Sequence, residues 1–109
     1  MPTYLITNRV PDDFTSSPEV FAAFTAWFEK LGPSLDDRGN PAFTTATVGN
    51  CGAGTVLGGY TLITADSLDA AVALAEGHPL ITRGGGVEVG ELTALNKGRH
   101  LISDEAGSS

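Results

Sequence analysis

Residues 58–92 read GGYTLITADSLDAAVALAEGHPLITRGGGVEVGEL, and this stretch decides the fold. Its first part, 60–65, is rich in β-branched and aromatic residues and predicts a strand that is buried on at least one face. Apolar residues at helical spacing then predict a helix. We expect Asp66 to cap its start and Gly77 to end it in the left-handed conformation. Residues 86–90 alternate again, so the stretch reads strand, helix, strand.

The first half of the chain follows the same plan. Residues 3–8 mix apolar and polar side chains in alternation and predict an inner strand. A helix is predicted from Ser17, a good N-cap, to Gly32, because large apolar side chains recur between them at helical spacing. Residues 42–48 are rich in threonine and predict the second strand. The glycine-rich segment 49–59 is then expected to be a hairpin connection.

The order β-α-β-β-α-β predicts a ferredoxin-like α+β fold, an antiparallel sheet with both helices on one face. We expect one domain over residues 1–95, followed by a C-terminal tail over 96–109. The other face of the sheet would expose apolar side chains, which is unfavourable in a monomer. The sequence therefore predicts a homodimer in which two sheets close face to face, giving a dimeric α+β barrel with a cavity.

Composition limits the possible partners of this chain. Among its 109 residues the formal net charge is −7, with a pI near 4.5, so nucleic acid and anionic membranes are not expected partners. No apolar run is long enough to span a membrane, and the first residues do not resemble a secretion signal. The single cysteine, Cys51, cannot form an internal disulfide. These features predict a cytoplasmic protein.

Several short motifs occur in a fixed order along the chain. They are AWF at 26–28, LG at 31–32, GNP at 39–41, GY at 59–60, ADSLDA at 65–70 and GGVEV at 85–89. In this set and order the chain resembles the YCII-related, DGPF-type family. The resemblance implies a ferredoxin-like domain that forms dimeric α+β barrels. It also implies two kinds of function, because some relatives use a His–Asp pair in the barrel cavity and others associate with sigma factors.

The first helix of this chain has no histidine at the place where the His–Asp pair would stand, and the Asp-Gly-Pro-Phe signature is replaced by Gly49-Asn50-Cys51-Gly52. The resemblance therefore leaves open whether the protein is an enzyme. A dimer with no retained chemistry is one of the alternatives. No cofactor-binding motif and no metal-ligand spacing is found, so neither a cofactor nor a metal is expected.

Glu88 is the first candidate for a functional residue. If Val87 and Val89 face the helices, Glu88 points into the dimer cavity, where a carboxylate can act as an acid or base. The alternative is a solvated side chain, or an ion pair across the dimer with Arg83. Tyr60 is a candidate ligand-binding residue, since its ring is apolar and its hydroxyl can form a hydrogen bond.

Trp27 is a second aromatic candidate for ligand binding, with the hydrophobic core as its alternative location. His78 is a weak catalytic candidate. It follows Gly77 at the end of a helix, where a charged imidazolium interacts well with the helix dipole. His100 lies in the tail, where we expect it to be exposed.

Two hypotheses of function follow. In the first, the protein is a small-molecule-binding or enzyme-like barrel with a largely apolar ligand. In the second, it is a regulatory or protein-interaction module, for example one associated with a transcription or sigma factor, and the acidic surface suits a basic partner.

Overall fold

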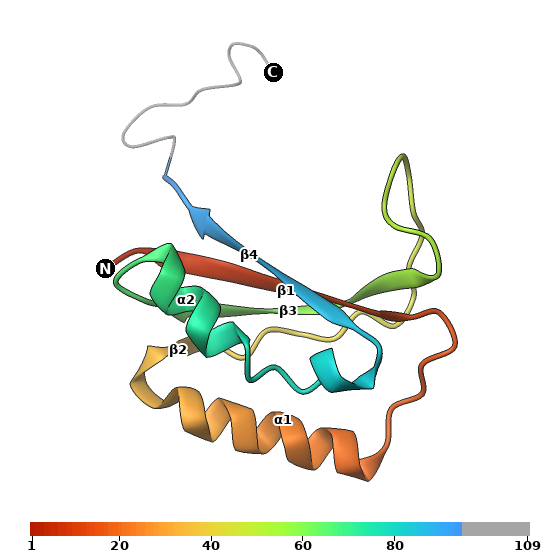
Figure 1. The fold of residues 1–109 in the computed structure, drawn as a ribbon, viewed down its shortest axis with the longest axis horizontal. Coiled ribbons are helices and arrows are strands. Elements are labelled where there is room, and N and C mark those ends of the chain that lie inside the picture. The colour runs from red at the N-terminus through yellow and green to blue at the C-terminus, as the bar shows by residue number, and fades with distance from the viewer. Residues whose placement is uncertain (95–109) are drawn as a thin grey trace.

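The structure, a computed structural model, describes residues 1–94. Its elements, in chain order, are β1 (Thr3–Pro11), α1 (Pro18–Leu31), β2 (Leu35–Asp37), β3 (Thr55–Thr64), α2 (Leu68–Ala75) and β4 (Gly86–Leu92). Short 3₁₀ helices follow α1 (Gly32–Ser34) and α2 (Ile81–Arg83). The strands form a sheet in the order β2-β3-β1-β4, and each pair is antiparallel. This arrangement confirms the ferredoxin-like α+β fold (Figure 1).

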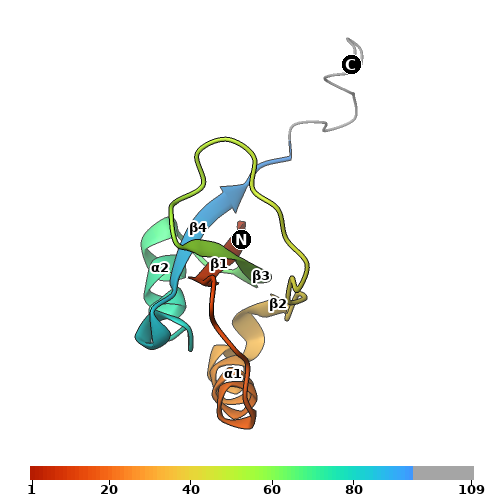
Figure 2. The same ribbon diagram turned by 90° about the vertical axis from the view of Figure 1, so that its right-hand side faces the viewer.

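The central strand β1 explains how the sheet separates a core face from an open face. Its burial alternates along the chain, and the side chains of Tyr4, Ile6, Asn8 and Val10 are buried. Successive side chains of a strand point to opposite faces, so these four share one face. Both helices pack on that face (Figure 2). The β1 residues that alternate with these four point to the other face.

The helix starts follow from local hydrogen bonding. The Ser17 hydroxyl accepts a hydrogen bond from the backbone N–H of Val20 at 3.3 Å, and Gly32 ends α1 at a φ of 54°, as predicted. The cap of α2 was predicted one residue too early. Ser67, not Asp66, accepts from the backbone N–H of Ala70 at 3.1 Å. Both residue types can cap, and the sequence pattern does not separate neighbours.

The end of α2 also differs from the prediction. Gly77 is not among the glycines with positive φ, so it is no left-handed cap. Its role is close approach, because a Cβ at this position would lie 3.2 Å from Cδ1 of Trp27. A larger residue would therefore displace the Trp27 ring.

The predicted strand over residues 42–48 is wrong. The second strand is the short β2, and the segment after it meets the sheet only through an isolated bridge between Pro41 and Gly59. Phe43 and Val48 are 83% and 91% exposed. Strand propensity reflects packing on neighbouring strands, and these side chains have no such surface. Part of the predicted connection 49–59 is strand instead, since β3 begins at Thr55.

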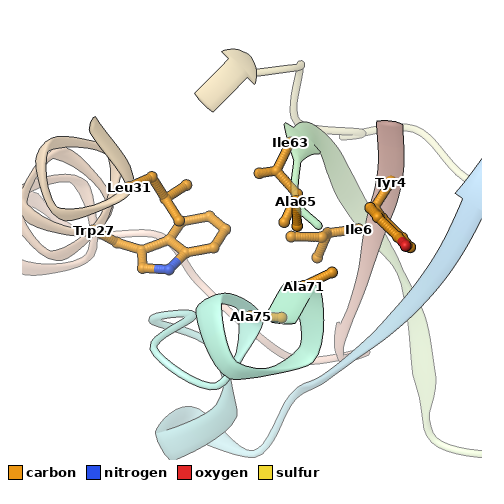
Figure 3. Close-up of a cluster of buried hydrophobic side chains, with 8 residues drawn as sticks. All are labelled: Tyr4, Ile6, Trp27, Leu31, Ile63, Ala65, Ala71 and Ala75. Atoms are coloured by element: carbon orange, nitrogen blue, oxygen red, sulfur yellow. The ribbon is translucent and has the colours of Figure 1, made fainter. Parts of the chain in front are cut away.

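The main core lies between the two helices and the sheet. Figure 3 shows its buried side chains, Tyr4, Ile6, Trp27, Leu31, Ile63, Ala65, Ala71 and Ala75. The small alanines let α2 lie close to the sheet, whereas α1 reaches the core through the large side chain of Trp27. Its indole N–H donates to the backbone oxygen of Leu74 at 3.1 Å. This hydrogen bond links α1 to α2.

No helix within residues 1–94 is long and apolar enough to cross a membrane. The predicted tail over 96–109, and with it the expected exposure of His100, lies outside the described residues.

Replacing Trp27 by alanine is expected to lower the free energy of unfolding by about 3–5 kcal/mol, because a buried ring and its hydrogen bond are lost and a cavity remains. Urea unfolding followed by circular dichroism measures this change. The matched control is Phe43→Ala, which removes an exposed ring and should change stability by less than about 0.5 kcal/mol. Equal effects of the two substitutions would contradict the placement of Trp27 in the core.

Candidate functional site

A cavity of about 530 Å³ lies between α1 and the sheet. Its walls come from α1, the second half of β1 with the residues that follow it, residues 56–61 of β3 and the segment after β2. Figure 2 looks along α1, which lies apart from α2 on the same side of the sheet. This volume falls in the range of small-molecule sites, roughly 300–1,000 Å³. The cavity is therefore a candidate site for a small molecule.

Most of the cavity wall is apolar. α1 contributes Val20, Phe21, Phe24 and Phe28, and the rings of Phe24 and Phe28 lie 5.9 Å apart. Phe21 is 67% exposed, and with the exposed Phe43 it lies at the rim. Aromatic walls of this kind bind apolar, ring-containing molecules.

The segment after β2 is tied to β3, so this wall is fixed. The backbone oxygen of Arg38 accepts from the Thr61 hydroxyl at 3.0 Å, and the backbone N–H of Ala42 donates to the oxygen of Gly58 at 3.0 Å. Gly39 has a φ of 76°, and a Cβ there would lie 1.7 Å from the backbone oxygen of Tyr60. Only glycine lets the chain run this close beside β3.

The polar groups of the cavity are few. Asn8 is only 5% exposed, lies on the helix side of β1, and its Oδ1 has no hydrogen-bond partner within residues 1–94. Gly58 makes room for it, since a Cβ at this position would lie 2.2 Å from Oδ1. The guanidinium of Arg38 lies over the Phe28 ring, 4.9 Å from its centre. A buried amide without a partner costs free energy, which a bound molecule can recover.

Tyr60 is the predicted site residue that lines this cavity. Its hydroxyl accepts a hydrogen bond from Nδ2 of Asn40 at 3.1 Å, which holds the phenol against the segment after β2. Tyr60 also borders a shallow depression on the open face, together with Leu5, Thr7 and Leu57. It therefore lies at the boundary between the two faces of the sheet.

Glu88 lies on the open face. Val87 and Val89 pack against the core, and the exposed Glu88 is directly opposite Thr7 of β1. Thr7 is opposite Tyr60 on its other side, so the sheet places the two candidates Glu88 and Tyr60 on either side of one residue. The helix-side cavity has no contribution from Glu88.

Trp27 does not line the cavity, because it is buried in the core beside it. It touches the cavity wall through Phe24, whose ring centre lies 6.4 Å away in an edge-to-face arrangement. The structure thus separates Trp27 from the open face that carries Glu88.

His78 is 2% exposed and lies between the rings of Phe24 and Trp27, with centres 5.1 Å and 4.8 Å away. Its Nδ1 accepts from the backbone N–H of Leu80 at 3.1 Å, so the proton of the neutral ring is on Nε2. Burial lowers the pKa of His78 from 6.5 to about 4. The predicted charged imidazolium at the helix end is therefore wrong, since desolvation outweighs the helix dipole.

Asn8, Arg38 and the phenylalanines of α1 line the cavity but were not expected as site residues. Asn8 could have been recognised from the sequence. It is the polar residue among the alternate positions of β1 whose other members, Tyr4, Ile6 and Val10, are buried and apolar. Within residues 1–94, no group of three or more His, Cys, Asp or Glu side chains is placed to hold a metal ion.

The chain resembles a known protein in structure but not in sequence. No protein-family model and no curated protein sequence matches the chain. Among solved structures, 5-chloro-2-hydroxyhydroquinone dehydrochlorinase (TftG) from Burkholderia phenoliruptrix AC1100, in complex with 2,5-dihydroxybenzoquinone, superposes with a TM-score of 0.56 at 18% sequence identity. The match covers 90% of this chain and 99% of that chain. The two chains share a fold.

The buried histidine predicts a pH dependence of stability. The folded pKa of about 4 lies below the unfolded value of 6.5, so the unfolded chain binds more protons between these pH values. Stability contributed by His78 is complete above pH 6.5 and is lost as the pH falls toward 4, by at most about 1.4 kcal/mol per pH unit. Urea unfolding at a series of pH values measures the slope.

His78→Asn should remove this slope, because the Asn Oδ1 can accept from the Leu80 N–H but does not titrate. His100→Asn is the control and should keep it. A wild-type slope between pH 4 and 6.5 that survives in His78→Asn would show that other groups cause the pH dependence.

Proposed function

We propose that this protein binds a small, largely apolar molecule in the cavity between α1 and the sheet, as an enzyme-like α+β barrel of the YCII-related type. The observation that carries the proposal is a sizeable aromatic cavity whose floor holds a buried amide without a partner. A core that served only stability would fill such a space with side chains. The ligand complex of the structural neighbour, TftG, with a small hydroxylated ring supports the same class of function.

The proposed site differs in position from the site expected from the sequence. There, the ligand was expected between two sheets, with Glu88 in the cavity. The helix-side cavity is instead formed within one chain, and it shares only Tyr60 with the predicted site.

The proposed assembly is still a homodimer in the cytoplasm. Support comes from the open face of the sheet, where register places Leu5, Leu57, Tyr60, Leu62 and Leu92. Leu57, Tyr60 and Leu92 are exposed in the single chain. Burying this face against a second copy would remove the apolar surface from water.

A protein-interaction module without catalysis is the second candidate, and the same open face is the observation that favours it. In that case the face would bind a different protein, and the cavity would have no ligand. The two candidates therefore differ in whether any small molecule stabilises the protein.

A thermal-shift screen against small aromatic and aliphatic acids, alcohols and amines tests the proposal. A specific ligand at roughly 100 times its Kd should add about 2.7 kcal/mol of stability. The double variant Phe21→Ala/Phe43→Ala removes the exposed rim rings and should weaken the hit about tenfold, since each ring contributes apolar contact. Glu88→Gln should leave it unchanged.

The pattern across the variants decides between sites. A hit that is lost in Glu88→Gln and kept in Phe21→Ala/Phe43→Ala would place the ligand between two sheet faces and overturn the proposed site. Light scattering on the same samples is expected to show a dimer. Absence of any hit in a protein that is monomeric, with its open face free, would favour the interaction module.

A further inference from the structure

Two polar side chains, Asn8 and Arg38, line the cavity at separate places, and their chemistry limits which ligands can bind there. We infer that the ligand of the proposed site is a ring-containing monoanion, with a hydroxyl group at Asn8 and a carboxylate at Arg38. This inference rests on the proposed function, because it specifies the molecule that the same cavity would take.

The Asn8 amide defines the neutral end of the ligand. An amide offers both a donor and an acceptor, and the Oδ1 of Asn8 is buried without a partner within residues 1–94. This oxygen has almost no accessible surface in the unbound protein, so a ligand hydroxyl can donate to it when the amide turns toward the cavity. A carboxylate cannot donate and would leave the oxygen without a partner.

Arg38 defines the charged end. Its guanidinium is always protonated and lies against the Phe28 ring at 4.9 Å, where it lines the cavity. Its backbone is held by the Thr61 hydroxyl, so the residue is anchored to β3. A planar cation on an aromatic wall suits a carboxylate, which it can bind through two parallel hydrogen bonds.

The two residues are anchored at separate points of the sheet. Asn8 is opposite Gly59, and Thr61, whose hydroxyl donates to the backbone oxygen of Arg38, is two residues farther along β3, a backbone separation of roughly 7 Å. From this anchor the Arg38 side chain extends to the Phe28 ring. A ligand with its hydroxyl and its carboxylate at opposite ends of one ring suits two separated groups, and the walls of Phe24 and Phe28 suit the ring.

Asp12, the carboxylate among the lining residues, lies at the other end. Arg38 is anchored at Thr61, which is opposite Ile6 of β1. Pro11, which precedes Asp12, is five residues farther along β1 than Ile6, a backbone separation of roughly 16 Å. Its charge is therefore too distant and too exposed to repel a carboxylate bound at Arg38.

The test uses calorimetric titration of the purified protein with para-hydroxycinnamate, cinnamate and the methyl ester of para-hydroxycinnamate. We expect the first to bind about tenfold more tightly than either analogue, which lacks the hydroxyl or the charge. Asn8→Leu should remove the preference for the hydroxyl, and Arg38→Met the preference for the carboxylate. Each variant should leave the other preference intact.

Asn50→Leu and Lys30→Met are matched controls, since neither residue lines the cavity, and both should keep both preferences. Asn8→Leu also replaces an unsatisfied buried amide, so unfolding by urea should show a protein at least as stable as the wild type. If the three probes bind equally, or fail to bind while other small molecules stabilise the protein, the ligand class is wrong but the proposed function stands. If nothing in the screen binds, both fall.

Discussion

The position of α1 depends on Trp27. This side chain fills the space between the helices, donates a hydrogen bond from its indole N–H to Leu74 of α2, and lies against Gly77, where no Cβ intervenes. The C-terminal part of α1 is thereby fixed to the main core, and Val20 fixes its start in a second buried cluster with Val10 and Leu80. Phe21 and Phe24, between these two points, line the cavity. A helix fixed by large side chains near its two ends, and not along its length by small ones, leaves room between itself and the sheet.

The opposite wall of the cavity depends on a backbone constraint. Gly39 lies so close beside β3 that any side chain would clash with the backbone of Tyr60, and backbone hydrogen bonds join the following residues to Gly58 and Tyr60. The cavity is thus bounded by two features that do not need a ligand for their shape. A preformed site of this kind loses little conformational entropy on binding.

The elements with strong local signals could be predicted from the sequence. Ser17 and Gly32 bound α1 correctly, and the alternation over 86–90 indicated a strand, of which Val87 and Val89 face the core. The strand predicted over 42–48 failed because β-branched residues favour a strand only where a neighbouring strand pairs with them. The cavity could not be predicted, since it depends on how far α1 lies from the sheet, which no local pattern encodes. Asn8 was the residue whose polarity within a buried series marked the site.

The central claim is that a small molecule binds on the helix side of the sheet. The most direct measurement is an NMR titration of isotopically labelled protein with para-hydroxycinnamate, following the side-chain amide of Asn8 and the backbone amides of Phe24 and Glu88. The account predicts saturable shifts at Asn8 and Phe24 with little change at Glu88. Shifts centred on Glu88 and its neighbours on the open face would contradict it.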